Sequence, residues 1–219
     1  MSSSSASAPA TAPTKSTKSK SGSSGKSRSR WRQTETGNLV STSCTVLGGG
    51  NIVLGGKSIL HPGVVLRGDL RRAGAAAAAS GTAGGGGKEP GVITIVMGKY
   101  CHVEENAVLR PGYKTYKGAF SYYPMKIGDL VTIGAGSVVE AAQIGTGVEI
   151  GKNCIIGSFA ILKDFCKIAD GAVVGPGTVV PSLTEWAGSP ARPIGHLPES
   201  TPEAVESKVK ALFLNFQPD

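Results

Sequence analysis

Aromatic side chains are scarce in this sequence of 219 residues, where Phe, Trp and Tyr together make up only 5%. This argues against a core packed on large rings and favours a thin, repetitive architecture filled by Val, Ile, Ala and Gly. Long apolar runs are missing as well. No segment approaches the roughly 18 residues that a membrane-spanning helix needs, so we expect no membrane insertion.

Cysteine and histidine are also few, with four and three residues respectively. No two cysteines form a Cys-x-x-Cys pair, so the sequence holds no zinc motif of that kind. Four thiols that are not arranged as a disulfide framework suit a reducing compartment.

Acidic residues are absent from the first 32 residues, and the first acid is Glu35. The formal net charge of +8 is concentrated in this stretch, which leaves the rest of the chain close to neutral. A near-neutral body argues against nucleic-acid binding. The Ser-, Ala-, Thr- and Lys-rich composition predicts a disordered basic tail over 1–34. A cleaved transit peptide and a regulatory, microtubule-seeking arm stay open as alternatives.

A second low-complexity segment, 73–90, contains five consecutive alanines and four consecutive glycines. It has no hydrophobic periodicity, so we expect a flexible surface insertion. The free-energy cost of closing a loop grows slowly with its length, and the surrounding fold should tolerate the insertion.

A repeat of six residues fills the rest of the chain. Aliphatic residues recur at every sixth position in its second half: Ile144, Ile150, Ile156, Leu162, Ile168, Val174 and Val180. Glycine directly follows four of them, and a smaller or moderate residue comes four places after the first six. The pattern extends upstream, with breaks in phase, through Ile127, Ile133 and Val139 and through Met97, Val103 and Leu109.

Six residues fit a short strand plus a turn. Three such sides close a triangular coil, and stacked coils pair in parallel with like residues above like. The sequence therefore predicts an all-β fold, a parallel β-helix of hexapeptide repeats, over 35–198. Similarity to hexapeptide proteins implies that the helix is left-handed. Three cysteines fall in inward positions, where we expect them to act as small core residues: Cys101, Cys154 and Cys166.

The repeats stop at Pro181, and Trp186–Pro193 resembles the exit segment that follows hexapeptide solenoids. Thr201 and Pro202 then mark a helix start. Apolar residues continue at helical spacing: Val205, Val209, Leu212, Phe213 and Phe216. We expect a C-terminal α-helix within 199–219 that covers a side or an end of the coil stack, with docking on a partner as the alternative.

Hexapeptide β-helices include acyltransferases, which take acyl-CoA and use a histidine base, and gamma-class carbonic anhydrases, which bind a metal through three histidines. His61, His102 and His196 lie at predicted turns or in the exit segment. We interpret them as ordinary turn or surface residues.

Residues 103–110 and 133–140 resemble the anhydrase segments that carry the metal ligands. The ligand positions fall on Arg110, Ala135 and Glu140. Alanine offers no lone pair and arginine stays protonated, so a metal-activated hydroxide is not expected. We therefore predict no catalytic, cofactor-binding or metal-ligating residue.

One stretch, 111–126, breaks the six-residue phase and is expected to leave the coil as a loop. It holds five of the twelve aromatic residues, with lysines among them. Exposed aromatic residues mixed with cations are typical of protein interfaces. Packing along the flank of the solenoid is the alternative, and stacking of nucleobases is a weaker one. The candidate partner-binding residues are Tyr113, Lys114, Tyr116, Lys117, Phe120, Tyr122 and Tyr123.

This loop is one of several segments that carry a resemblance to a known family; the others are 49–54, 66–70, 141–145, 151–157 and 162–168. They are similar to the dynactin subunit 5 family of β-helix proteins. The resemblance covers about 35–216 apart from the Ala/Gly insertion. The basic tail and the insertion depart from the family pattern.

The resemblance implies a non-enzymatic structural subunit of the dynactin pointed-end complex, which supports binding of cargo (endosome) adaptors for dynein-driven microtubule transport. It implies as partners a second β-helix subunit (dynactin subunit 6), the actin-related protein at the pointed end and the p62-type subunit, and indirectly dynein and cargo adaptors. It also implies a cytoplasmic, cytoskeleton-associated location and no cofactor. Two alternatives stay open: a gamma-carbonic-anhydrase-like organellar subunit without metal ligands, and a hexapeptide acyltransferase.

Overall fold

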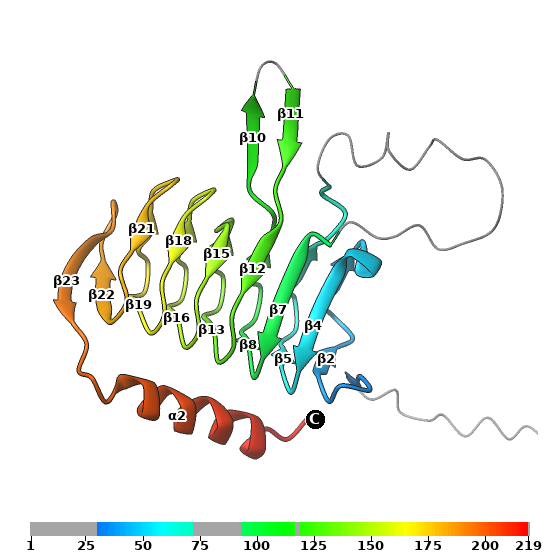
Figure 1. Ribbon diagram of the computed structural model, residues 1–219. Coiled ribbons are helices and arrows are strands. Elements are labelled where there is room, and N and C mark those ends of the chain that lie inside the picture. Colours follow the sequence, from blue (N-terminus) through cyan, green and yellow to red (C-terminus); the bar gives the residue numbers. More distant parts are fainter. Residues whose placement is uncertain (1–29, 72–92, 117–118, 219) are drawn as a thin grey trace, which may run out of the picture.

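The computed structural model describes residues 30–71, 93–116 and 119–218 (Figure 1). The predicted insertion and most of the predicted tail lie outside these residues. The described chain winds as a stack of coils, and successive strands fall in turn on three sheets whose neighbouring coils pair in parallel. The predicted parallel β-helix with a C-terminal α-helix is confirmed.

The first sheet has an antiparallel strand at each end and parallel strands between. In spatial order its strands are β1 (Trp31–Gln33), β2 (Leu39–Ser41), β5 (Ile59–Leu60), β8 (His102–Val103), β13 (Thr132–Ile133), β16 (Glu149–Ile150), β19 (Lys167–Ile168), β22 (Thr184–Ala187) and β23 (Arg192–His196).

The second and third sheets are wholly parallel and supply the other two sides of each coil. The second sheet consists of β3 (Thr45–Leu47), β6 (Val65–Arg67), β9 (Val108–Leu109), β14 (Val138–Val139), β17 (Ile155–Ile156) and β20 (Val173–Val174). The third consists of β4 (Ile52–Gly56), β7 (Ile95–Lys99), β12 (Met125–Ile127), β15 (Gln143–Ile144), β18 (Ile161–Leu162) and β21 (Val179–Val180). A short 3₁₀ turn, η1 (Gly49–Asn51), joins β3 to β4.

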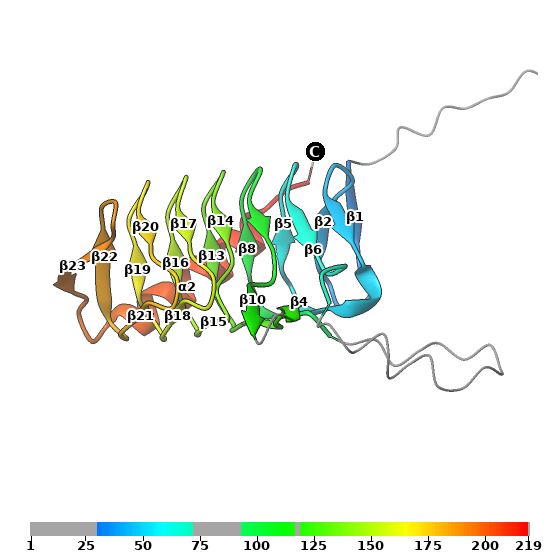
Figure 2. The same ribbon diagram turned by 90° about the horizontal axis from the view of Figure 1, so that it is seen from above.

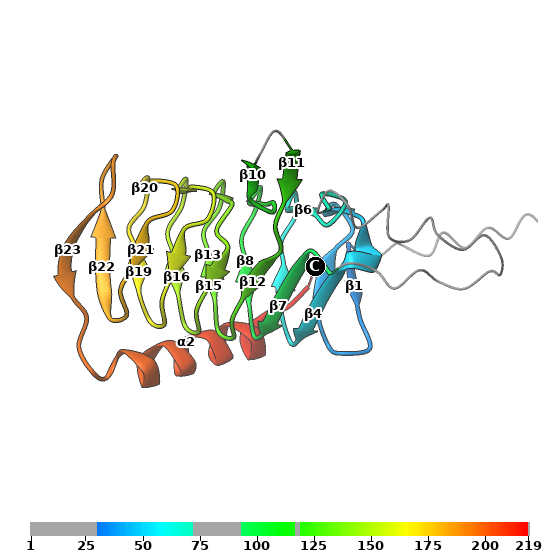
Figure 3. The same ribbon diagram turned by 45° about the horizontal axis from the view of Figure 1, so that its top comes forward.

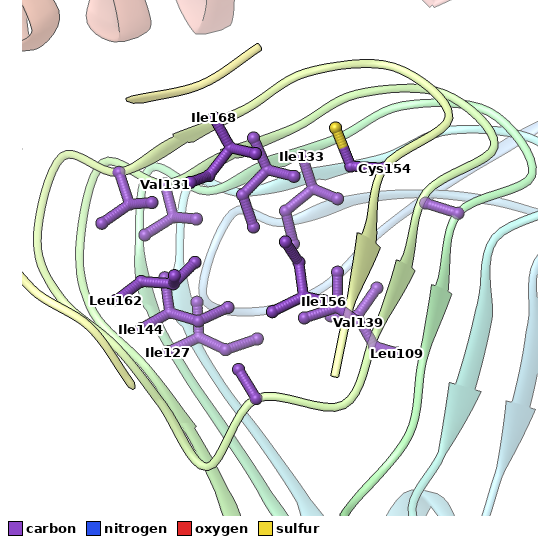
Figure 4. Close-up of a cluster of buried hydrophobic side chains, with 14 of the residues drawn as sticks. Leu109, Ile127, Val131, Ile133, Val139, Ile144, Cys154, Ile156, Leu162 and Ile168 are labelled. Atoms are coloured by element: carbon purple, nitrogen blue, oxygen red, sulfur yellow. The ribbon is translucent and has the colours of Figure 1, made fainter. Parts of the chain in front are cut away.

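The interior of the coil is filled by the aliphatic residues of the six-residue repeat. Ile133 pairs in register with Ile150, and Ile150 pairs with Ile168, so that like residues stack. Figure 4 shows Ile133 and Ile168 pointing into the coil together with Leu109, Ile144 and Leu162. All are at most 2% exposed. Burying each such side chain stabilises the fold by about 1.5–3 kcal/mol before the entropic cost.

The corners between strands explain the glycine content. A Cβ atom on Gly134 would lie 2.5 Å from the backbone of Gly151 in the next coil, so only glycine fits at this position. Other corners need a left-handed backbone, which Gly136 adopts with φ 69° and Asn153 with φ 53°. Both residue types adopt this conformation more readily than others.

The three cysteines expected in the interior are buried there. Cys101, Cys154 and Cys166 are at most 2% exposed, and they are free thiols, as is Cys44. Burial raises the pKa of Cys101 and of Cys166 to about 12. Thiols with such pKa values remain protonated at neutral pH, so they pack as small apolar groups.

Helix α2 (Thr201–Asn215) runs back along the first sheet from the last coils to the neighbourhood of β8, and the chain after it continues toward the first coils (Figures 1 and 2). Val205 and Val209 are its buried residues. Further along, the Phe213 ring lies 5.9 Å from that of Tyr100. The helix therefore covers a side of the coil stack, the first of the two expected arrangements. No helix in the described ranges is long and apolar enough to cross a bilayer.

Part of the predicted tail forms regular structure. The tail is expected to run to residue 34, whereas β1 forms at Trp31–Gln33 and pairs with β2. The reason is aromatic packing: the Trp31 ring lies 4.8 Å from that of Phe216, beyond the end of α2. A single tryptophan at the edge of a low-complexity stretch gives no local sign of this distant contact.

Candidate partner-binding site

Within the predicted loop 111–126, two strands form a β-hairpin that projects from the coil stack, whereas Met125 and Lys126 belong to β12 of the third sheet. The hairpin leaves the stack between β9 of the second sheet and β12 of the third, and consists of β10 (Tyr113–Tyr116) and β11 (Ala119–Tyr122). The two strands are antiparallel, with Tyr113 opposite Tyr122 and Thr115 opposite Phe120. Figures 1 and 3 show the hairpin standing clear of the three sheets.

Three of the candidate residues form an aromatic cluster on one side of the hairpin. The Phe120 ring lies 5.4 Å from that of Tyr113 and 5.0 Å from that of Tyr122. Alternate residues of a strand share a face, which places these rings together. Tyr113 is 52% exposed and Phe120 46% exposed. The cluster therefore supports the hairpin while leaving a large apolar surface in water.

Tyr123 has a different role from the other rings. Its ring packs 5.3 Å from that of Phe159, at a corner of the coil. The backbone N–H of Tyr123 donates to the carbonyl oxygen of Gly112 at 2.9 Å. Tyr123 thus fastens the base of the hairpin to the coil.

The lysines of the hairpin lie apart from the aromatic cluster or outside the described residues. Lys114 is exposed, and it pairs with Ser121 on the side of the hairpin away from the aromatic cluster. Lys117 lies outside the described residues, as does the side chain of Tyr116.

Two histidines treated separately in the sequence meet in the fold. His61 Nε2 and His102 Nε2 are 2.7 Å apart, and their ring centroids are 4.7 Å apart. The Trp31 and Phe216 rings pack edge-on against His61, at 5.7 and 5.5 Å. The sequence analysis does not predict this pair. The repeat could have indicated it, because residues 59–60 pair in register with residues 102–103 in the next coil, and this brings His61 to the same corner as His102.

Both histidines are held neutral by their surroundings. Burial lowers the pKa of His102 to about 4, and the charge of His61 adds to this effect. Burial also lowers the pKa of His61, against the opposing influence of Glu105 and Glu104. One neutral ring can therefore donate to the other. Among the described residues, no three His, Cys, Asp or Glu side chains are grouped so that they could hold a metal ion.

The three positions that align with the metal ligands of the anhydrases make an ion pair and hydrogen bonds within this protein. Arg110 Nε donates to Glu140 Oε1 at 2.6 Å, and the Ser158 hydroxyl donates to Glu140 as well. The backbone N–H of Ala135 donates to Glu104 at 3.0 Å. These groups form an ion pair and corner hydrogen bonds.

The outer faces of the sheets differ in chemistry. On the first sheet Glu149, Lys167 and Glu185 form a row in register, and Lys208 of α2 pairs with Glu149. A groove of about 540 Å³ runs beside this row. The second sheet instead carries an aliphatic row, made up of Val65, Val108, Val138, Ile155 and Val173. The aromatic hairpin rises at the corner beyond this row.

Comparison with solved structures identifies the fold. A hexapeptide transferase family protein from Anaplasma phagocytophilum is similar with a TM-score of 0.55 and 20% identity, covering 81% of this chain and 89% of that one. A perosamine N-acetyltransferase from Caulobacter crescentus is similar with a TM-score of 0.51 and 15% identity, covering 72% and 56%. This likeness is one of fold alone. Hexapeptide-repeat transferases are left-handed β-helices, and the expected left hand is confirmed.

Comparison of sequences is more specific. A curated relative, dynactin subunit 5 of Dictyostelium discoideum, is 37% identical over 114 residues, which are 52% of this chain and 46% of the relative. The matched region thus spans just under half of that protein. The family model described as dynactin subunit 5 matches residues 89–219, more than half of this chain and all of it beyond the first coils. The match includes the hairpin, the regular coils and α2, and the chain accordingly belongs to the dynactin subunit 5 family.

Proposed function

We propose that this protein is a non-enzymatic structural subunit of dynactin, part of the pointed-end complex that supports binding of cargo adaptors for dynein-driven transport. The observation that carries the proposal is the exposed aromatic hairpin. Tyr113 and Phe120 are about half exposed, although burying them would be favourable. Family membership supports a role inside an assembly, where such a surface is covered.

The proposed partners are other dynactin subunits: the second β-helix subunit 6, the actin-related protein at the pointed end and the p62-type subunit. Dynein and cargo adaptors are indirect partners. The location that goes with this role is cytoplasmic and cytoskeleton-associated. The proposed contact residues are the seven candidates of the hairpin, with the cluster Tyr113, Phe120 and Tyr122 as its energetic centre. Aromatic residues in such positions commonly dominate binding energy.

The side-chain chemistry supports a binding role over an enzymatic one. Each histidine is placed on or beside the coil: His61 and His102 contact each other, and His196 lies in β23. The aromatic hairpin, which leaves the coil as the loops of acyltransferases do, carries no histidine. The protein therefore shares the fold of the acetyltransferases, but its protruding hairpin has no histidine that could act as the general base.

The first test is affinity purification of the tagged full chain with a triple variant, Tyr113→Ala, Phe120→Ala and Tyr122→Ala. We expect recovery of dynactin subunits to fall at least tenfold, because the hot spot of the contact is removed, while the melting temperature of the isolated chain changes by only a few degrees. The matched control is Ile155→Ala, which removes a side chain of similar exposure, 50%, from the second sheet. Undiminished recovery by the triple variant would place the contact elsewhere. Failure of the wild-type chain to recover any dynactin subunit would overturn the proposed function.

A further inference from the structure

The two ends of the coil stack differ in how they are closed. At the N-terminal end β3 is the last strand of the second sheet and β4 the last of the third, and no described strand pairs with their outer edges. Only the first sheet is closed there, by β1. At the other end a turn covers the edge of β20: the N–H of Val173 donates to Gly188 and its carbonyl accepts from Ala191. Trp186 packs against the core beside this turn.

The interior is exposed at the N-terminal end. Val46 pairs in register with the buried Leu66, so its side chain occupies an inward position of the coil. Nevertheless Val46 is 43% exposed, whereas Val174 and Val180, in the corresponding positions of the last strands, are 1% and 0% exposed. The contrast identifies the N-terminal end as an uncovered cross-section of the core. Four further interior residues are only partly buried there: Val40, Cys44, Ile52 and Leu54.

Residues 1–29 and 72–92, which adjoin this end in the sequence, have a composition poorly suited to covering it. Residues 1–29 contain no Leu, Ile, Val, Phe, Tyr or Trp, and residues 72–92 contain a single one, Val92. The turn η1 at the same corner consists of two glycines and Asn51. An open solenoid end normally needs a cap, and these two segments offer almost no large aliphatic side chains for one.

The free backbone groups define what a partner for this end looks like. Thr45 and Leu47 direct their backbone hydrogen bonds toward β6, through Val64 and Gly68. In a parallel ladder the intervening N–H, that of Val46, therefore points to the open edge. The edges of β3 and β4 lie on two faces that meet at a corner. A single extended segment pairs with one of them, whereas one coil of a β-helix supplies two short strands joined at the required angle.

We propose that this uncovered end stacks on the open end coil of a second β-helix protein, which continues the second and third sheets and buries the exposed core. The partner presents an aliphatic, uncharged interior, since the positions to be covered are Val40, Cys44, Val46, Ile52 and Leu54. Val53, 43% exposed, and Leu47, 40% exposed, flank the contact on its outer side. The inference rests on the proposed function in one respect: it takes the second β-helix subunit of dynactin as the partner to be tested.

The experiment measures binding of purified subunit 6 to the full-length chain. We expect Val46→Glu and Val53→Glu each to weaken binding at least tenfold, because each places a charge in a dry contact. Val53 points outward, so this variant tests the surface without altering the interior. The matched control is Val179→Glu, which is 47% exposed on the outer face of the same sheet at the opposite end. It should bind as the wild type does. Hydrogen exchange should show the amide of Val46 becoming protected on binding, as expected for a new strand pairing.

Each outcome is decisive. Equal binding by the wild type, Val46→Glu and Val53→Glu overturns the stacking while leaving the proposed function intact. So does a wild-type chain that enters dynactin through other subunits without binding subunit 6. A chain that dimerises alone through the same end, as light scattering would reveal, overturns the choice of partner. A chain that recovers no dynactin subunit overturns both proposals.

Discussion

At the scale of single residues, the histidine pair links parts of the chain that are far apart in sequence. His61 and His102 meet at one corner, and Trp31 and Phe216 close over them. The other charged groups around the pair are Glu104, Glu105 and Lys152. Protonation of the accepting ring would remove the acceptor of the hydrogen bond, and protonation of either ring would place a charge in a partly buried site. The two carboxylates only partly offset that cost.

This pair predicts a loss of stability in mild acid. Histidine in the unfolded chain titrates near pH 6.5, whereas the pKa of His102 in the folded protein is lowered to about 4. As pH falls between these values the unfolded state binds the proton first, so the free energy of unfolding decreases, by on the order of 3 kcal/mol for this group. Urea unfolding at pH 7 and at pH 4.5 measures the change.

The variant His102→Leu should show a smaller fall in stability over the same pH range, because it removes the titrating group. His196→Leu, at an exposed position of β23, is the control and should leave the pH dependence unchanged. Parallel pH profiles for wild type and His102→Leu would contradict the prediction.

The pairing of His61 with His102 could be predicted in part from the sequence, since the repeat places the two histidines one coil apart. The breaks in phase before residue 97 conceal it.

At the scale of elements, the hairpin and the helix show what the sequence predicts well and what it does not. The break in the six-residue phase predicts that the chain leaves the coil over 111–126; the structure has a hairpin of β10 and β11 there, and the chain is back in the third sheet at Met125. The sequence contains a partial signal for the hairpin: Lys114 lies between Tyr113 and Thr115, Ser121 lies between Phe120 and Tyr122, and Gly118 separates the two runs. The helical spacing predicts α2, but its path along the first sheet depends on contacts such as Lys208 with Glu149, which no local pattern encodes.

The position of α2 predicts a matched pair of mutations. Val209→Asp should destabilise the protein by about 2–4 kcal/mol, because Val209 is 2% exposed and the variant buries a charge without a partner. Leu214→Asp, on the same helix but 78% exposed, should change stability by less than about 0.5 kcal/mol. Thermal unfolding followed by circular dichroism compares them. If both variants melt together with the wild type, the helix is not docked as described.

At the scale of the whole molecule, three faces of one prism carry three different chemistries. The first face is charged and covered by α2, the second is aliphatic, and the third is mixed. The sequence predicts the stack itself, because the inward residues repeat with a strict period. The sequence is less informative about the chemistry of the outer faces. An outward position tolerates many residue types, and the face to which it contributes depends on which sheet its strand joins.

The distribution of charge predicts how the whole molecule behaves on a polyanion. Residues 1–29 hold five of the 23 lysines and arginines and none of the acids, so their removal lowers the formal net charge from +8 to +3. We expect a chain that begins at residue 30 to elute from heparin at clearly lower salt, with an unchanged melting temperature. Equal retention of the two chains would locate the polyanion-binding charge on the folded body instead.

Helix α2 also sets the length of the stack. It begins beside the last coils, and the chain that follows it reaches Trp31 in the first strand through Phe216. Each coil adds about 4.8 Å to the prism, and each helical residue spans about 1.5 Å. Gain or loss of one coil would therefore shift Trp31 relative to Phe216 by the length of roughly three helical residues. The two rings would then no longer be in contact. Helix length and coil number are thus coupled, and either can change during evolution only if the other changes with it.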